Sequence, residues 1–269
     1  MSSSSARALL VTMVGEYAVA DPTGFWTTTV VDGLGLLGIG PKAARQALSG
    51  VAADGWLTRE KVGRRARWTL TPGGRHLFAA GLTRIGRSVR DELRWDGRWL
   101  LLFTTVPEAE RKVRHRLRTR LSFAGFGSIG QGVWISPRVD AEAYAAEILA
   151  EVGGAVRASS FTAMFGTVGE GRDVISQAWD LGRLRSGYEE FIADFARVEA
   201  RTEAQAFVAR TRIVHAWLHL LSMDPGLPAQ FLLDDWPADR ARMMLRQRYP
   251  RWAGPADRWW AAASAVDDG

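Results

Sequence analysis

The fold of the first part of this chain is decided by Gly40-Pro-Lys-Ala-Ala-Arg-Gln-Ala-Leu-Ser-Gly-Val-Ala-Ala-Asp-Gly-Trp-Leu-Thr-Arg-Glu-Lys-Val-Gly-Arg-Arg-Ala-Arg-Trp-Thr-Leu70. Pro41 suits the first turn of a helix, because no intrahelical partner is needed for an N–H there. The apolar residues that follow repeat at helical spacing and form one face, namely Ala44, Ala47, Leu48 and Val51. A strand, a basic tight turn and a returning strand complete the stretch.

The opposite face of this helix repeats the same spacing with polar side chains, which are Lys42, Arg45, Gln46 and Ser49. Such side chains hydrogen-bond phosphates or base edges in a major groove. In the turn, Gly63 permits a positive φ, and the arginines Arg64, Arg65 and Arg67 suit phosphates or a narrow minor groove. We therefore predict a winged helix-turn-helix over residues 1–72 that binds double-stranded DNA. The alternatives are a solvated helix face and a charged hairpin tip.

The positive charge is concentrated in the same region. The net charge of the 269 residues is +6, and residues 1–90 alone, with twelve Lys and Arg against five acids, carry +7. A basic module beside a nearly neutral remainder indicates a polyanionic partner for that module. The chain has no cysteine, no apolar run of membrane-spanning length and no recognisable signal peptide. We expect a soluble cytoplasmic protein that does not interact with membranes.

Three further regions follow along the chain. Residues 73–95 predict a connector helix. Residues 96–170 begin with the buried strand Trp99-Leu-Leu-Leu-Phe103 and predict the order βαββαβ, which fits a ferredoxin-like domain. Residues 171–269 predict a helical C-terminal domain, in which one helix runs from Pro237 to Tyr249. The fold class expected from the whole sequence is α+β.

Four segments together resemble the PaaX family, the repressors of phenylacetate-degradation operons. They are Gly55-Trp-Leu57 followed by Gly63-Arg-Arg65, Trp95-Asp-Gly-Arg-Trp-Leu-Leu-Leu102, Gly125-Phe-Gly127, and Asp224-Pro-Gly-Leu-Pro-Ala-Gln-Phe-Leu-Leu-Asp-Asp-Trp236. The resemblance implies a winged helix, a central domain with the fold of CRISPR-adaptation nucleases and a helical C-terminal domain. It also implies a homodimeric repressor on a pseudo-palindromic operator, released by an aryl-acyl coenzyme A thioester.

Candidate effector-binding residues combine cations for the phosphates with rings for an aryl group. They are Trp179, Arg183, Arg185, Tyr188, Arg212, His215 and Trp217. The alternative is that these rings belong to the core and these arginines to the surface. His215 and His219 have the i, i+4 spacing of a zinc pair, but no third ligand is evident, so we predict no metal site.

An enzyme is the minority hypothesis. The first central strand, Leu100 to Thr105, carries neutral side chains where a metal-dependent nuclease needs a carboxylate, and the chain lacks a nucleophile elbow and a phosphate-binding loop. We therefore expect no catalytic residue and no cofactor. The rival classes are a nuclease-like processing enzyme and a ligand-independent architectural DNA-binding protein. The basic run from Glu110 to Arg120 is interpreted as a solvated or dimer-edge face rather than as a second DNA surface.

Overall fold

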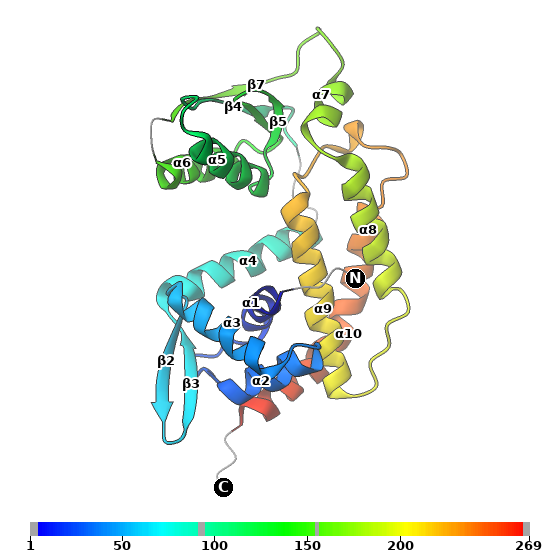
Figure 1. The fold of residues 1–269 in the computed structure, drawn as a ribbon. Helices are drawn as coiled ribbons and strands as arrows, with labels where there is room; N and C mark the ends of the chain where they lie inside the picture. The colour runs from blue at the N-terminus through cyan, green and yellow to red at the C-terminus, as the bar shows by residue number, and fades with distance from the viewer. Residues whose placement is uncertain (1–4, 91–94, 154–155, 266–269) are drawn as a thin grey trace. The chain divides into compact units, whose positions relative to one another are not determined.

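The computed structural model describes residues 5–90, 95–153 and 156–265, which form mixed helix and sheet structure (Figure 1). The chain divides into two compact units. The first comprises residues 1–90, 191–218 and 240–269, and the second comprises residues 91–190 and 219–239. Residues 171–269, expected to form a domain of their own, are thus shared between the two units. Compact units and domains of a family need not coincide, so the predicted domain boundaries stay a prediction.

The N-terminal part of the first unit is a three-stranded sheet with helices. Its elements are α1 (Ala6–Tyr17), β1 (Phe25–Trp26), α2 (Thr27–Leu36), α3 (Pro41–Ala53), β2 (Leu57–Val62), β3 (Arg65–Leu70) and α4 (Pro72–Arg90). The sheet is antiparallel in the order β1-β3-β2, so β2 is an edge strand. Helix α1 packs against α2, α3 and α4 and buries Leu10, Met13 and Val14 completely.

Helices from the end of the chain complete the core of this unit. They are the last part of α8 (Leu181–Phe195), most of α9 (Glu203–Met223) and nearly all of α10 (Ala238–Ser264). The ring of Tyr17 in α1 lies 5.2 Å from those of Phe207 in α9 and Trp260 in α10, between centroids. The hydroxyl of Thr29 donates to the carbonyl of Ala263 over 2.8 Å. The first and last parts of the sequence therefore share one apolar core.

The prediction that the last helix ends at Tyr249 was wrong, because α10 continues through Pro250 and Pro255 to Ser264. Each proline removes one helical hydrogen bond and clashes with the preceding turn, which costs about 3 kcal/mol in a helix interior. Beyond Tyr249, however, an apolar stripe is buried in the first unit, namely Trp252, Ala256 and Trp260. Burial of two tryptophan rings offsets this cost, and the sequence pattern alone did not contain that information.

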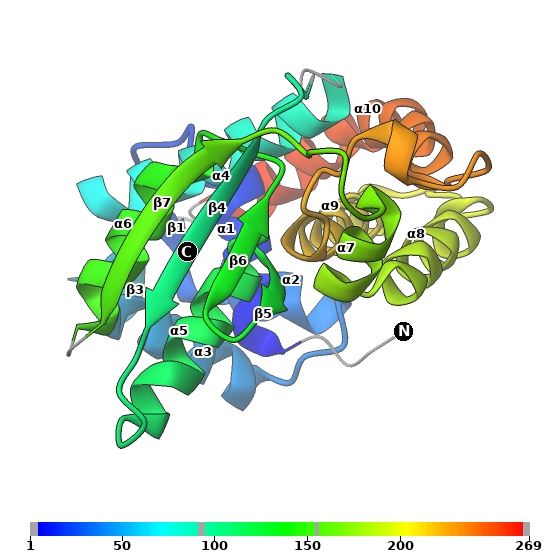
Figure 2. The same ribbon diagram turned by 90° about the horizontal axis from the view of Figure 1, so that it is seen from above.

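The second unit contains a four-stranded antiparallel sheet in the order β5-β6-β4-β7. Its elements are β4 (Trp99–Thr105), α5 (Arg111–Phe123), β5 (Gly127–Gly130), β6 (Val133–Ser136), α6 (Ala141–Val152) and β7 (Arg157–Ala163), followed by α7 (Gly171–Ala178) and the short η1 (Ala229–Phe231). Helices α5 and α6 lie side by side on one face of this sheet (Figure 2).

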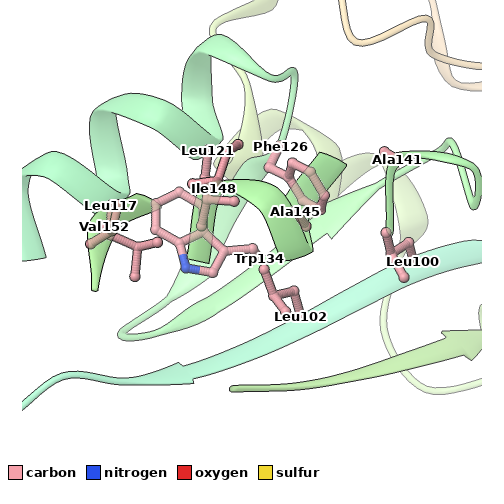
Figure 3. Packing of buried hydrophobic residues seen from close by; sticks show 10 residues of the cluster. All are labelled: Leu100, Leu102, Leu117, Leu121, Phe126, Trp134, Ala141, Ala145, Ile148 and Val152. Atoms are coloured by element: carbon pink, nitrogen blue, oxygen red, sulfur yellow. The ribbon is translucent and has the colours of Figure 1, made fainter. Parts of the chain in front are cut away.

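Alternation along β4 divides the side chains between the two faces of this sheet. Leu100 and Leu102 point toward the helices and belong to one buried cluster with Leu117 of α5, Trp134 of β6 and Ile148 of α6 (Figure 3). Trp99, on the opposite face, joins a second cluster with residues of α7 and η1. One side of the sheet is thus buried at β4 and β6, and the other is covered in part. No described helix is long and apolar enough to cross a membrane.

Candidate nucleic-acid interface

Helix α3 presents its four predicted DNA-binding side chains on one exposed face, and these are Lys42, Arg45, Gln46 and Ser49. The opposite face is fully buried at Ala44 and Val51 and 1% exposed at Leu48. The helix begins at the extended residue Gly40, whose carbonyl accepts the amide of Ala44 over 3.1 Å. The i, i+3, i+4 pattern of small apolar residues therefore determines which face of α3 meets solvent.

The far end of α3 is held by a contact with α1. Arg7 of α1 forms an ion pair with Asp54, which caps α3, and its guanidinium lies 5.3 Å from the ring centroid of Trp56. Both charged side chains are 43% exposed, so the pair stabilises the fold by about 1 kcal/mol at most. The packing of the buried apolar face of α3 against α1 therefore contributes more to the position of α3 than this pair does. The sequence analysis missed this contact because 47 residues separate the partners.

The hairpin after α3 has a two-residue turn. Val62 pairs with Arg65 in the antiparallel register, which leaves Gly63 and Arg64 at the tip, and Gly63 has φ 59°. That left-handed conformation favours glycine over any residue with a Cβ. Arg64 and Arg65 are exposed, as expected for residues that contact a polyanion.

Arg67, the third predicted hairpin contact, is placed differently. Its guanidinium lies 5.5 Å from the ring centroid of Trp26, its side chain is half-buried, and its Nε is buried without a hydrogen-bond partner. Trp26 is the direct cross-strand partner of Arg67 on β1. This position favours a structural role inside the sheet, and contact of Arg67 with DNA stays a prediction.

Two exposed cations of β2, Arg59 and Lys61, were not among the predicted site residues and lie on the face of the hairpin opposite to Arg65. They alternate along an edge strand, so they lie on the same face of the hairpin. Arg59 also lies 5.9 Å from the ring centroid of its cross-strand neighbour Trp68. The period-2 spacing of cations in this strand was the signal that could have identified them.

The base of the hairpin is fixed to the start of α2. The indole Nε1–H of Trp68 donates to the hydroxyl of Thr27 over 2.9 Å, and that hydroxyl donates to the carbonyl of Ala66 over 3.2 Å. Trp68 is 6% exposed, so its N–H needs this internal partner. The hairpin and α2 are thereby held in a defined relation within the first unit.

A buried ionic cluster in the core of the first unit joins α1 to α9 and α10. Arg210, whose side chain is 8% exposed, donates to Glu16 over 3.0 Å and to the hydroxyl of Tyr249 over 3.0 Å. Tyr249 donates in turn to Glu16 over 3.1 Å, and Asp257 accepts a further hydrogen bond from Arg210. Burial raises the pKa of Glu16 above its usual value, although Arg210 and Tyr249 oppose that shift.

Among the predicted effector residues of the second unit, two rings are used internally. The indole N–H of Trp179 donates to the carbonyl of Gly125 over 3.2 Å. Tyr188 is 2% exposed, and its hydroxyl donates to the carboxylate of Asp224, which also accepts the amide of Gly226 over 2.7 Å. These contacts show what two of the segments used for the family resemblance do structurally, because Gly125 and Asp224 lie in them.

The two arginines of the same helix differ from one another. Arg185 forms ion pairs with Glu189 and Asp235, and its hydrogen bonds to these carboxylates raise its pKa, Asp235 having the larger effect. Arg183 is exposed; its backbone amide donates to Asp180 over 2.9 Å, and its guanidinium pairs with no acidic side chain among the residues that the structure describes. Of the cations predicted here, Arg183 is therefore the more accessible to a ligand.

The other three predicted effector residues belong to the first unit. Trp217 is 2% exposed and packs against Phe191 with 5.4 Å between ring centroids. The Nδ1 atom of His215 lies 3.0 Å from the hydroxyl of Thr12, and Arg212 is half-buried. The seven predicted effector residues thus come from two compact units, and several of them contribute to cores. In the described part of the chain, no three His, Asp or Glu side chains are grouped to hold a metal ion.

The two units define an α+β chain that combines a helix–hairpin module with an antiparallel sheet domain. Three family models match it in sequence: PaaX-like protein over residues 5–74, PaaX protein central Cas2-like domain over 87–175, and PaaX-like protein C-terminal domain over 179–262. The chain belongs to the PaaX family. The family resemblance recognised in the sequence is therefore confirmed.

Two known proteins are similar to this chain in sequence or in structure. The chain is 25% identical over 263 residues to the transcriptional repressor PaaX of Escherichia coli (strain K12), a match that covers 94% of this chain and 82% of that protein. A solved structure, the uncharacterized protein Rv0674 from Mycobacterium tuberculosis, is similar with a TM-score of 0.58 at 24% identity, covering 95% of this chain and 97% of that one. The latter likeness concerns the fold alone.

Proposed function

We propose that this chain is a transcriptional repressor that binds operator DNA through an N-terminal winged helix-turn-helix, as its E. coli relative is a transcriptional repressor by name. The observation that carries the proposal is the division of α3 into a buried apolar face and an exposed face with Lys42, Arg45, Gln46 and Ser49. The adjoining hairpin, with Arg64 and Arg65 near its tip, supports the assignment as a wing.

In this proposal α3 enters the major groove and the hairpin follows the backbone. Arg45 suits a bidentate contact with guanine and Gln46 one with adenine, whereas Lys42 and Ser49 suit phosphates. Arg64 contacts phosphates without reading sequence. The roles of the residues differ, so the proposal predicts different consequences when they are removed.

Binding measurements on selected and random duplexes test these roles. Arg45→Ala and Gln46→Ala should each lower the preference for the selected operator by about 1–3 kcal/mol, because a bidentate base contact is lost. Arg64→Ala should weaken binding to both duplexes about equally. It should also lower the slope of log K against log[salt] by about 0.9, the value for one phosphate contact. The base-reading role fails if Arg45→Ala weakens both duplexes equally and changes only the salt dependence.

We assign a ferredoxin-like fold without catalytic activity to the central domain. The antiparallel order β5-β6-β4-β7, with α5 and α6 on one face, supports the fold. Strand β4 ends in Leu-Phe-Thr-Thr, without the carboxylate that a catalytic metal needs. The purified protein should cleave neither DNA nor RNA with Mg²⁺ or Mn²⁺. Cleavage that is lost in Glu108→Gln or Asp140→Asn would contradict this.

A homodimer would match a pseudo-palindromic operator, with two recognition helices about one helical turn, or a multiple, apart. The edge strand β7 supports pairing with a second copy, because its outer backbone groups have no neighbouring strand in the sheet. Phe161 of β7 is 57% exposed and lies beside Phe103, which is 42% exposed. Sedimentation should show a dimer that Phe161→Glu dissociates, and an unchanged dimer would place the contact elsewhere.

For release from DNA, the family resemblance supports an aryl-acyl coenzyme A thioester. Among the described residues of the second unit, Arg183 is the predicted cation that forms no ion pair, and arginine suits the phosphates of coenzyme A. At about a hundred times its dissociation constant, the ligand should stabilise the fold by roughly 2.7 kcal/mol and release DNA. Thermal shift and DNA release, measured with thioesters and with the free acids, test this. Activity of the free acids alone would refute the assignment.

A further inference from the structure

Helix α5 presents a dense cationic surface in the second unit, which the proposed repressor mechanism does not use. Seven of its thirteen residues are basic and all seven are exposed, namely Arg111, Lys112, Arg114, His115, Arg116, Arg118 and Arg120. The helix contains no acidic residue. Along one side the surface forms a shallow hollow lined by Arg111, Lys112, His115, Arg116, Thr119 and Arg120.

This distribution of charge opposes the stability of the helix itself. Lys112, Arg116 and Arg120 follow one another at i, i+4 spacing, where like charges repel. Arg111 and Lys112 also lie in the first turn, where positive charge opposes the helix dipole. A helix whose exposed face served only solvation would be more stable with mixed charges. The surface is therefore arranged for an anionic partner outside the unit.

The protein itself neutralises little of this charge. Arg120 pairs with Glu151 of the neighbouring helix α6 over 3.0 Å, with both side chains about half exposed. Arg114 reaches only backbone carbonyls, at 3.3 and 3.5 Å. Across residues 95–153 and 156–265, Arg111, Lys112, Arg116 and Arg118 have no acidic side chain within 4.0 Å. These four guanidinium and ammonium groups are available to a ligand.

The chemistry of this face favours a nucleic-acid backbone over a membrane. A helix that lies on a bilayer inserts an apolar face, but Leu117 and Leu121 of α5 are 2% and 0% exposed within the core, and Val113 packs against the same core. Of the six residues that line the hollow, only His115 carries an aromatic ring on which a base or an aryl group could stack, and the others are cations and one hydroxyl. What remains is a row of cations, mostly arginine, which suits successive phosphates and carries no sequence information.

In place of the solvated or dimer-edge interpretation of this run, we propose that the exposed face of α5 binds the sugar–phosphate backbone of duplex DNA and adds a sequence-independent contact to the operator contacts of α3. The proposal rests on the proposed function, since it assigns α5 to the same DNA. Lys112, Arg116 and Arg120 recur about every 6 Å along the helix axis, so one side of α5 meets several phosphates. The contact increases affinity for any duplex and leaves the preference for the operator unchanged.

The test measures how DNA affinity depends on salt for the full-length protein and the variant R111Q/K112Q/R116Q. Glutamine is a good helix former, so the backbone of α5 is retained. Each lost phosphate contact lowers the slope of log K against log[salt] by about 0.9, so we expect a decrease of about 2–3. Between 50 and 200 mM salt the wild type should then lose about 20- to 60-fold more affinity than the variant. The ratio of operator to random-duplex affinity should not change.

A matched control is R172Q/R240Q/R251Q, which removes three exposed arginines outside α5 and should retain the wild-type slope. An α5 variant with the slope of the wild type overturns the proposal. So does binding to phosphatidylserine vesicles that the α5 variant loses while its duplex binding is unchanged.

If the wild type shows no preference for any selected duplex, the proposed function fails, and the slope on a random duplex still decides the role of α5. If the triple variant melts well below the wild type, R116Q replaces it, with an expected slope decrease of about 0.9.

Discussion

Helices α3 and α5 both have thirteen residues and both bury a narrow apolar stripe, yet their exposed faces differ. The face of α3 combines two cations with an amide and a hydroxyl, whereas that of α5 is cationic almost throughout. An amide beside a guanidinium provides both donors and acceptors that can distinguish base edges, whereas a row of cations provides donors alone and responds to charge density. The comparison teaches that the number of cations on a helix does not indicate sequence recognition. The mixture of donors and acceptors does.

Helix α3 belongs to the same compact unit as the buried cluster around Arg210. Removal of Arg210 should therefore have the largest effect of the substitutions considered, a loss of stability of this unit. Arg210→Met leaves Glu16 buried without its cation, which should lower the free energy of unfolding by about 3–5 kcal/mol. Arg258→Met removes an exposed pair with Glu203, whose side chains are 64% and 46% exposed, and should cost less than about 1 kcal/mol. Urea unfolding of both variants measures the difference.

The effect of Arg210→Met should also depend on pH. Burial holds the pKa of Glu16 above its unfolded value, and the variant loses the opposing effect of Arg210. Because the pKa of Glu16 is higher in the folded state than in the unfolded state, the folded state is favoured at pH values below the unfolded pKa. This stabilisation is lost as the pH rises through the folded pKa. The variant should therefore be closest to the wild type near pH 4 and most destabilised at neutral pH. An equal loss at both pH values would contradict the assigned role of Glu16.

Substitutions of arginine by lysine should have smaller effects and should distinguish base recognition by α3 from charge recognition by α5. Arg45→Lys keeps the charge of α3 but loses the fork that guanine requires, so operator preference should fall by about 1–3 kcal/mol. Arg116→Lys keeps the charge of α5, so the salt slope and the affinity should remain close to those of the wild type. Fluorescence anisotropy on operator and random duplexes measures both. Equal losses of operator preference would remove the distinction between the helices.

The smallest expected effect concerns stability. Arg116→Gln relieves repulsion with Lys112 and Arg120, so it should raise the free energy of unfolding by about 0.4–1 kcal/mol. Arg45→Gln relieves repulsion with Lys42 alone and should add about 0.2–0.5 kcal/mol. Chemical denaturation at low ionic strength measures these gains, and high salt should reduce them. A loss of stability in Arg116→Gln would show that the charges of α5 are paired within the protein.

Local patterns predicted much of the candidate interface. The spacing of Ala44, Leu48 and Val51 determined which face of α3 is buried, and the turn at Gly63 is a local property of the chain. Arg67 was predicted at the same surface, but Trp26, 41 positions earlier, lies beneath its guanidinium. Contacts between distant positions leave no periodic signal, so the sequence could not separate this arginine from its neighbours.

The effector residues show the same limit. Tyr188 and Arg185 matched the expected combination of ring and cation, yet Asp224 and Asp235 occupy their polar groups in the structure. The prediction that α10 ends at Tyr249 was wrong for a related reason. The partners of Trp260, which lies beyond that point, are near the start of the chain. Sequence reasoning succeeded where one element determines its own exposed face and failed where a remote element supplies the partner.

The long helix α10 has a consequence for how the protein is made. Its Trp260 packs against Tyr17 and Phe25, and the carbonyl of Ala263 accepts the hydroxyl of Thr29. During synthesis on the ribosome, the N-terminal unit therefore cannot complete its core until the last turns of α10 have left the exit tunnel. A fragment that lacks the last turns of α10 leaves Tyr17 and Phe25 without these partners, so we expect it to expose apolar surface that favours aggregation.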